Sequence, residues 1–318
     1  MAFDGGSRAA STINFLGLSF STLDLEAALD HVSVHASIGA PFAYVATPNV
    51  DHVVKLAREP SRKPLYESAW LTLNDSRILQ ALAKNAGVAL PNVTGADLTE
   101  ALFDRVIDRH ETITIIGGDA ETINELKRRY RLADVRWHAA PMGLKQRPAA
   151  IVAAAAFAAK QNARFTFIAV GAPQQEMIAY AIAQHEGASG VGLCVGAALD
   201  FLAGRVERAP IWMRGAGLEW LHRLASEPQR LWRRYLVDGP YVFSLFPRMA
   251  RGNGGGEFGL TFFVERILTQ AERGEHTQQN RAPDKHRAQR GERGRRIIAS
   301  ACGDETKPAQ HRKRQGPG

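Results

Sequence analysis

Asp75 is the first residue whose type and position could do chemistry. It directly follows the apolar run AWLTLN at 69–74. A carboxylate in a partly desolvated site can accept a proton from a sugar hydroxyl, so Asp75 is a candidate general base. An aspartate in a solvated loop has the same local sequence, and both interpretations stay open at this point.

A second motif is GAPQQE at 171–176, which follows the apolar run RFTFIAV at 164–170. Its two amides and its carboxylate could bind a nucleotide base, a ribose or a sugar hydroxyl. The same residues would also begin a helix, with Pro173 in the first turn and Glu176 favoured by the helix dipole. The motif fits both interpretations equally.

An arginine-rich and aromatic segment, residues 205–251, holds nine arginines and no lysine. Guanidinium groups match phosphate oxygens, so Arg223, Arg230 and Arg233 are candidates to hold a diphosphate. The interleaved tryptophans and phenylalanines also suit a membrane interface, where basic residues are attracted to anionic lipids. A nucleic-acid surface and an amphipathic helical pair packed on the domain are two further interpretations.

Several catalytic and metal-binding motifs are missing. The sequence has no GxGxxG and no Walker lysine, which argues against a dinucleotide-dependent oxidoreductase. The histidines show no HxH or HExxH spacing, the two cysteines are far apart, and the DxD pair of many sugar-nucleotide enzymes is absent. The sequence therefore predicts a metal-independent protein without a resident cofactor.

Apolar runs and helical patterns alternate along the first two thirds of the chain. Runs of strand type lie at 42–47, 69–74, 112–118, 164–170 and 190–195. This alternation predicts an α/β protein with a mainly parallel sheet and flanking helices. Ligands of such sheets bind beyond the carboxyl ends of the strands, which is where the candidate polar residues fall.

The charge is divided unevenly along the 318 residues. The formal net charge is +8, of which residues 1–204 contribute −2 and residues 205–251 contribute +5. We therefore expect an α/β core at 1–204 and a helical arginine–aromatic appendage at 205–250. A glycine-rich hinge and a disordered basic tail are expected at 251–318. Without a signal peptide or an apolar run of about eighteen residues, a cytoplasmic location is expected.

Together the segments resemble the WecG/TagA/CpsF family of bacterial glycosyltransferases, also classed as glycosyltransferase family 26. The resemblance covers residues 12–247. Its motifs, in chain order, are TPN at 47–49, the Asp75 loop, VTGADL at 93–98, IIGG at 115–118, VGAPQQE at 170–176, GVGLCVGAALDFLAG at 190–204, RAPIWM at 208–213 and GLEWLHRLASEPQRLWRRY at 217–235. The last three are highly specific together.

The resemblance implies a Rossmann-like core and an inverting enzyme of bacterial exopolysaccharide or cell-envelope polysaccharide biosynthesis. Such an enzyme moves a sugar from a UDP-sugar to a saccharide on a polyprenyl (undecaprenyl) diphosphate. The resemblance also implies peripheral attachment to an anionic membrane surface, the inner face of the cytoplasmic membrane, through the appendage. Neither a metal ion nor a nucleic acid is part of this picture.

The family motifs assign roles residue by residue. Asp75 matches the catalytic base. The substrate-binding positions that match are Thr47, Asn49, Gln175, Glu176, Arg223, Arg230 and Arg233. Two departures stand out: Ser76 occupies a position where the family commonly has glycine, and the chain beyond about residue 252 has no counterpart in the family pattern.

A noncatalytic phosphate- or nucleic-acid-binding protein that uses the basic C-terminal third is the alternative from another class. The sequence leaves the donor sugar open among glucose, N-acetylmannosamine and N-acetylmannosaminuronic acid. It also leaves open the acceptor saccharide and the oligomeric state, including a homo-oligomer.

Overall fold

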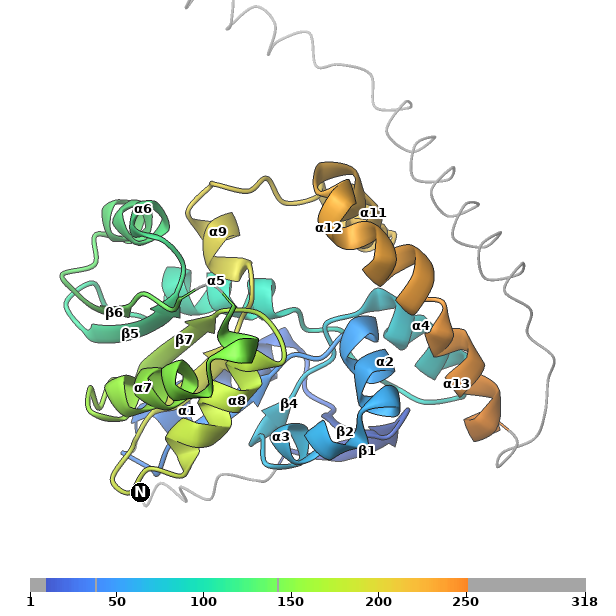
Figure 1. The fold of residues 1–318 in the computed structure, drawn as a ribbon, viewed down its shortest axis with the longest axis horizontal. Helices are drawn as coiled ribbons and strands as arrows, with labels where there is room; N and C mark the ends of the chain where they lie inside the picture. The colour runs from blue at the N-terminus through green and yellow to red at the C-terminus, as the bar shows by residue number, and fades with distance from the viewer. Residues whose placement is uncertain (1–9, 38, 142, 251–318) are drawn as a thin grey trace, which may run out of the picture. The chain divides into compact units, whose positions relative to one another are not determined.

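The structure is a computed structural model that describes residues 10–37, 39–141 and 143–250 (Figure 1). The chain divides into two units, residues 1–267 and 268–318. The predicted glycine-rich hinge and tail at 251–318 lie outside the described residues, and the architecture below is that of the first unit.

A six-stranded parallel sheet in the order β4-β3-β8-β7-β5-β6 forms the centre of this unit. Its strands are β3 (Ala43–Ala46), β4 (Leu71–Thr72), β5 (Thr112–Gly117), β6 (Asp134–His138), β7 (Phe165–Ala169) and β8 (Val191–Cys194). The predicted α/β, Rossmann-like class is confirmed. The sequence pattern missed β6, an edge strand whose half-buried residues DVRWH form no apolar run.

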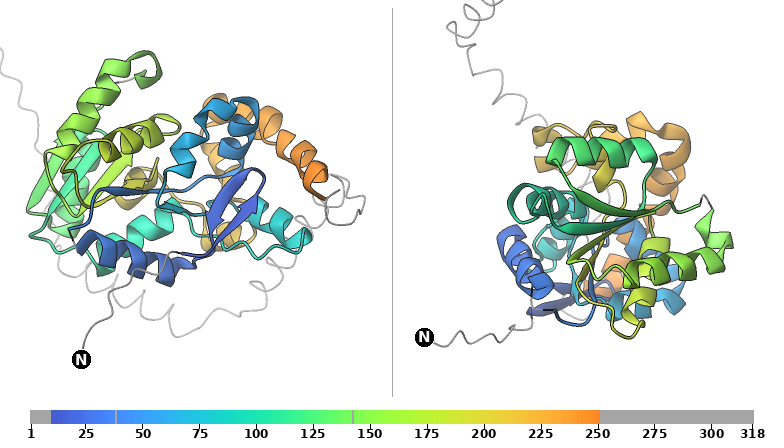
Figure 2. Two further views of the ribbon diagram at one scale, coloured as in Figure 1. Left: turned by 90° about the horizontal axis from the view of Figure 1, so that it is seen from below. Right: turned by 90° about the vertical axis from the view of Figure 1, so that its left-hand side faces the viewer.

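The two faces of the sheet contact two separate cores. Within β5, Ile115 belongs to one core and its neighbour Ile116 to the other, because successive strand side chains point to opposite faces. The first core includes residues of α1 (Leu25–Ser37), α5 (Gly95–Arg105), α6 (Ala120–Tyr130) and α9 (Ala198–Leu202), and the second includes residues of α7 (Pro148–Ala159) and α8 (Gln174–Ala183). Helices therefore cover the sheet on both sides (Figure 2).

A third core joins the N-terminal hairpin to helices that follow β3 and β4. It contains residues of β1 (Thr12–Phe15), β2 (Leu18–Ser21), α2 (Val50–Arg58), α3 (Pro64–Glu67), which follows the 3-10 turn η1 (Pro60–Arg62), and α4 (Arg77–Asn85). Phe15, Phe20 and Leu79 are fully buried within it. The remaining short turn of the core region is η2 (Leu144–Gln146).

The predicted appendage is helical. Its elements are α10 (Ile211–Gly215), α11 (Glu219–Ser226), α12 (Pro228–Trp232), the π-helical turn η3 (Arg233–Asp238) and α13 (Tyr241–Ala250). Val242 of α13 has no exposed surface and belongs to the third core, which attaches this helix beside α2. No helix among residues 10–250, as far as they are described, is long and apolar enough to cross a membrane.

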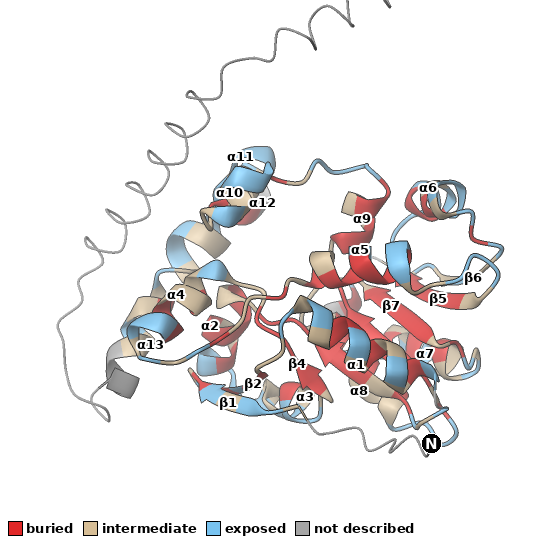
Figure 3. Ribbon diagram, turned by 180° about the vertical axis from the view of Figure 1, so that it is seen from behind, coloured by how far each residue is buried: buried red, intermediate tan, exposed pale blue. Residues whose placement is uncertain are grey.

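Much of the appendage surface is nevertheless exposed, in contrast to the strands of the sheet (Figure 3). An ion pair between Arg58 of α2 and Asp238 of η3 adds to the attachment through Val242. The Arg58 guanidinium carbon also lies 5.0 Å from the ring centroid of Tyr241. The attachment of the appendage to the core therefore combines apolar side chains of α13, of which Val242 is fully buried, with a charged contact.

We predict that Val242→Ala lowers the unfolding free energy by about 1.5–3 kcal/mol, because it removes buried methyl groups and leaves a cavity. The matched control is Val237→Ala, whose side chain is 51% exposed, and the change there should stay within about 0.5 kcal/mol. Thermal or urea unfolding measures both. Equal effects of the two variants would contradict the attachment of α13 to the third core.

Candidate active site

The carboxyl ends of four neighbouring strands bring most of the predicted site residues to one edge of the sheet. Asp75 follows β4, Thr47 and Asn49 follow β3, and Gln175 lies in the first turn of α8 after β7. The turn at Gly196 follows β8, which lies between β3 and β7. Residues far apart in the sequence thus share one edge, as expected for ligand sites of parallel sheets.

Thr47 is buried at this edge and fixes the start of α5. Its Oγ1 donates to the carbonyl oxygen of Cys194, 3.2 Å away. A Cβ on Gly95 would lie only 2.9 Å from the same Oγ1, so the first turn of α5 approaches Thr47 closely because residue 95 is glycine. The VTGADL motif therefore has a packing reason for its glycine.

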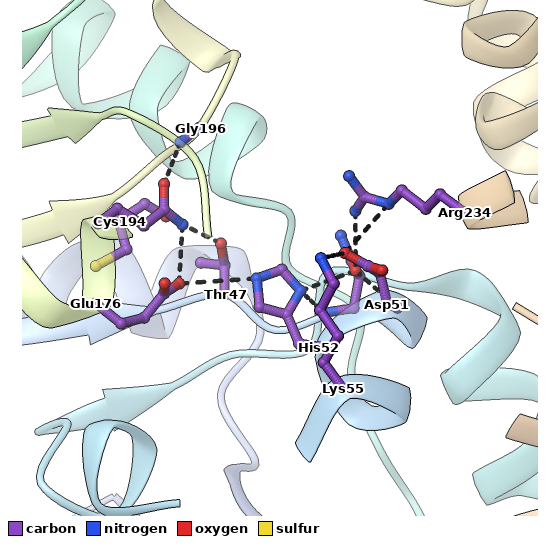
Figure 4. A network of polar contacts seen from close by, with 10 residues as sticks. Thr47, Asp51, His52, Lys55, Glu176, Cys194, Gly196 and Arg234 are labelled. Atoms are coloured by element: carbon purple, nitrogen blue, oxygen red, sulfur yellow. Dashed lines mark hydrogen bonds and ion pairs between the residues drawn. The ribbon is translucent and has the colours of Figure 1, made fainter. Parts of the chain in front are cut away.

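Gln175 and Glu176 are both buried. Figure 4 shows the polar network that includes Glu176, His52 and Gly196. The Gln175 amide accepts from the backbone N–H of Gly196 at 3.0 Å and donates to Glu176 Oε1 at 2.9 Å. His52 Nε2 lies 3.7 Å from that Oε1, while Glu176 Oε2 has no hydrogen-bond partner among the described residues. These two predicted site residues support the turn after β8, and their direct contact with substrate stays a prediction.

Asn49 caps α2 and contacts the appendage. Its Oδ1 accepts from the N–H of Asp51 at 3.1 Å and from Arg234 Nη2 at 3.3 Å. Asp51 Oδ2 lies 2.7 Å from Lys55 Nζ and 3.4 Å from Arg234 Nε. Burial alone would raise the pKa of Asp51, but Arg234 and Lys55 outweigh it and hold the pKa below its usual range.

Asp75 has the most perturbed carboxyl pKa of the site. Burial raises this pKa to about 8, with help from the negative charges of Glu219 and Asp97. A hydrogen bond from the backbone N–H of Gly95 and the positive charge of Arg223 act in the opposite direction. The residue as a whole keeps some exposed surface, and a carboxyl with a pKa near 8 has a basicity that suits proton transfer near neutral pH.

The loop of Asp75 does not require the glycine that the family commonly has after the aspartate. Ser76 has a φ of −159°, which is extended backbone, and its side chain caps α4 by accepting from the N–H of Leu79 at 3.2 Å. On the other side, the backbone oxygen of Asn74 accepts from the Asn92 side chain at 3.0 Å. Asp75 is therefore held between two hydrogen-bonded neighbours.

The three predicted arginines have different surroundings. Arg223 of α11 is close enough to Asp75 to lower its pKa, and its guanidinium carbon lies 5.9 Å from the ring centroid of Phe201. Arg233 is exposed, 6.0 Å from the ring centroid of Trp232. The side chain of Arg230 lies outside what the structure describes. Contact of these arginines with a diphosphate stays a prediction.

The sequence pattern did not single out four charged residues that lie near this edge: Asp97, Arg208, Glu219 and Arg234. Thr94 caps α5 by accepting from the Asp97 N–H at 2.9 Å, so Asp97 lies in the first turn of this helix. The carboxylate of Asp97 pairs with Arg208 at 2.8 Å. For Arg208 and Arg234, which pair with carboxylates of the core, the sequence offered one indication: residues 205–251 contain arginine but no lysine.

The Gly117–Gly118 turn has a packing role. Gly117 has a φ of +92°, and a Cβ there would lie 2.7 Å from the carbonyl oxygen of Ala169. Only glycine allows β5 to pass this close to the end of β7. The following Asp119 caps α6, accepting from the Thr122 N–H at 2.8 Å, and pairs with Arg205 at 2.7 Å. These contacts give the IIGG motif a packing reason for its first glycine.

Within the described ranges, no three His, Cys, Asp or Glu side chains are grouped so that they could hold a metal ion. Metal independence itself stays a prediction from the sequence, and it is tested by activity rather than by geometry.

A comparison with known protein families identifies the family to which this chain belongs. The profile of the glycosyl transferase WecG/TagA/CpsF family matches residues 13–253, which is most of the chain. The chain belongs to this family, as the motifs predicted, and is therefore a glycosyltransferase. Family membership favours an enzyme over the noncatalytic phosphate- or nucleic-acid-binding alternative.

One similar protein is the N-acetylglucosaminyldiphosphoundecaprenol N-acetyl-beta-D-mannosaminyltransferase of Bacillus spizizenii. The two sequences are 27% identical over 205 residues, which cover 63% of this chain and 77% of that protein.

We predict that Asp75→Asn raises the thermal midpoint at pH 9 and changes it little near pH 4. The native pKa of about 8 exceeds that of an unfolded aspartate, about 3.9, so folding favours the protonated carboxyl. Wild-type stability should therefore fall as pH rises from about 4 to about 8, while asparagine stays neutral. Each kcal/mol regained corresponds to about 2–4 °C in a domain of this size.

Scanning calorimetry between pH 4 and pH 9 measures this difference. Asp30→Asn, at an exposed aspartate of α1, is the matched control. A difference between Asp75→Asn and wild type that does not change with pH would contradict the raised pKa.

Proposed function

We propose that this chain is an inverting glycosyltransferase that uses a UDP-sugar and acts on a saccharide linked to undecaprenyl diphosphate. Family membership supports the reaction class. The name of the Bacillus relative supports N-acetylglucosamine on diphosphoundecaprenol as the acceptor and N-acetylmannosamine as the transferred sugar. By this proposal the enzyme serves synthesis of a cell-envelope polysaccharide or an exopolysaccharide.

The observation that carries the mechanism is the position of Asp75 at the carboxyl end of β4, where burial raises its pKa and Arg223 of α11 supplies a positive charge. In the proposed step, the acceptor hydroxyl oxygen forms a bond to the anomeric carbon of the donor. Asp75 takes the hydroxyl proton, and the bond from the anomeric carbon to the UDP oxygen breaks on the opposite face. A single in-line attack inverts the configuration, so one base is sufficient.

Arginine would stabilise the negative charge that develops on the departing UDP. Arg223 is placed near Asp75, and the motif adds Arg230 and Arg233 as proposed partners of a diphosphate. Guanidinium groups supply this charge without a metal ion, which is why we propose a metal-independent reaction. Thr47 and Asn49, at the end of β3, are proposed to face the sugar.

The appendage has two chemically different sides, which supports peripheral binding to a membrane. Leu218, Leu231 and Val242 are buried. The large apolar side chains exposed on the same helices and the turns beside them are Ile211, Trp212, Leu221, Trp232, Leu236 and Val237. Exposed tryptophan and leucine beside arginine suit the interface of an anionic bilayer. We place the enzyme on the inner face of the cytoplasmic membrane, where its lipid-linked acceptor lies.

We predict that Asp75→Asn lowers the transfer rate by about 10²–10⁴-fold, because the acceptor hydroxyl loses its base. Binding of UDP should stay within about twofold, since the amide keeps the shape of the carboxyl. UDP release with a short-chain prenyl-diphosphate N-acetylglucosamine acceptor measures the rate, and calorimetric titration measures UDP binding. Asp30→Asn serves as the control, and wild-type turnover by Asp75→Asn would overturn the base assignment.

We predict that Trp232→Ser combined with Leu236→Ser reduces binding to anionic vesicles at least about tenfold. Each side chain would lose roughly 1.5–3 kcal/mol of apolar burial in the interface. Flotation with phosphatidylglycerol-containing vesicles measures binding, and transfer to a water-soluble short-chain acceptor should be retained. Val152→Ser, at an apolar residue of α7 that is 62% exposed, is the matched control. Equal flotation of wild type and the double variant would contradict the membrane role of the appendage.

A further inference from the structure

Arg208 lies at the junction between the core and the appendage and is surrounded by acidic groups. Its side chain is only 14% exposed, and its Nη2 lies 2.8 Å from Asp97 Oδ1 and 3.2 Å from Thr94 Oγ1. Its Nη1 lies 3.5 Å from Glu100, and its Nε lies 3.8 Å from Glu219 of α11. One guanidinium therefore joins the first turns of α5 to the appendage.

The same first turn of α5 contacts the proposed base. The chain that leads into α5 is hydrogen-bonded next to Asp75, because the Val93 N–H donates to the backbone oxygen of Asn74 at 2.9 Å. The Gly95 N–H, which lies between Thr94 and Asp97 in the sequence, acts on the Asp75 carboxyl. Asp97 and Glu219, two partners of Arg208, also face Asp75 closely enough to act on it electrostatically. Arg208 therefore does not touch Asp75 itself but acts on it through Asp97 of α5 and Glu219 of α11, which it pairs with.

We propose that Arg208 and Glu219 are positioning residues for Asp75: Arg208 holds the appendage carboxylate of Glu219 and the first turn of α5 in place around the Asp75 side chain. This inference rests on the proposed role of Asp75 as the catalytic base. Neither residue is assigned contact with a substrate.

The charges that face Asp75 come from two elements. The groups of α5 that act on Asp75 are the Gly95 N–H and the Asp97 carboxylate. The groups of α11 that act on it are Glu219 and Arg223. The two acidic groups favour the protonated form of Asp75, and the N–H and Arg223 favour the ionised form. Arg208 offsets part of the effect of both acidic groups because it pairs with both.

One further cation belongs to this balance. Arg214 Nη1 of α10 lies 3.6 Å from Asp97 Oδ1, so Asp97 keeps one positive partner when Arg208 is removed. Glu219 then has no ion-pair partner among the described residues, and its charge acts on Asp75 without the opposing guanidinium. Removing Arg208 and removing the Glu219 charge should therefore act on Asp75 in opposite directions.

This arrangement makes the strength of the base depend on the appendage. Asp75 belongs to the core, whereas Glu219 and Arg223 are carried by α11 and reach Asp75 only when the appendage is docked. A carboxyl with a pKa near the working pH is a stronger base than an ordinary aspartate, at the cost of being partly protonated. The docked appendage thus contributes to the chemical step itself.

The test is the pH dependence of kcat for UDP release between pH 5.5 and pH 9.5, with saturating donor and the short-chain acceptor. We expect kcat of the wild type to rise with increasing pH, with an apparent pKa near 8, the value for Asp75. This rise is the acid limb of the profile. Glu219→Gln should move this acid limb down by about one pH unit, and Arg208→Gln should move it up by a similar amount. Arg208→Lys, which keeps the charge, should return the limb towards the wild-type position.

Matched controls are Glu125→Gln and Arg128→Gln, which break an exposed ion pair on α6 and should leave the profile unchanged. A purely structural role would lower kcat or the thermal midpoint at all pH values without moving the limb. If Arg208→Gln is too unstable to assay, Glu219→Gln decides alone, since it keeps the Arg208–Asp97 pair.

The outcomes separate the two proposals. The positioning roles are overturned if the acid limb of the kcat profile of Glu219→Gln stays in place or moves to higher pH. The base assignment remains intact in that case, provided that Asp75→Asn still loses transfer. Full transfer by Asp75→Asn overturns both. Opposite shifts of the two charge-removing variants, with lysine rescue, support the positioning roles.

Discussion

Pairing between appendage arginines and core carboxylates is the interaction on which this site depends. Burying a charge is costly unless an opposite charge compensates it, and here the compensating groups lie on different parts of the chain. Arg208 pairs with Asp97 of α5, and Arg234 pairs with Asp51 of α2. Residues 205–238 therefore add a compensating positive charge to two separate stretches of the core, at Asp97 and, together with Lys55, at Asp51.

This dependence explains why the boundary between a core and an appendage is less sharp than the composition suggests. The charge distribution divides the chain near residue 204, and the helices beyond that point do carry the arginines. Yet Val242 completes a core that begins at Phe15, and the appendage supplies charges next to Asp75. The appendage therefore contributes buried residues to the folded unit and also forms part of its exposed surface.

The strands that position the site could be predicted because buried parallel strands form continuous apolar runs. The polar residues after those runs then fall at one edge, which made Asp75 and Gln175 candidates from the pattern. Thr47 and Asn49 became candidates through the resemblance to the family. The short edge strand β6 was not predictable in this way, because it is only half-buried and has a polar composition.

The orientation of the arginines could not be predicted from the sequence. Arg233 and Arg234 are neighbours of the same type, but the first is exposed beside Trp232 and the second reaches Asn49 and Asp51. Which of them faces inward depends on the π-helical turn and on how α13 packs, and neither has a local signature. The cap of α5 shows the same limit, since Thr94 and Asp97 are both good capping residues.

The burial of Val242 with Phe15 and Phe20 in one core also has a consequence for synthesis of the protein. A chain that emerges from the ribosome folds from its N-terminus, but this core lacks a side chain until residue 242 has been made. All six strands precede that point, so the sheet can form before the third core closes. The polar edge of the sheet can therefore form first, and α11 with Glu219 and Arg223 and then α13 with Val242 are added later.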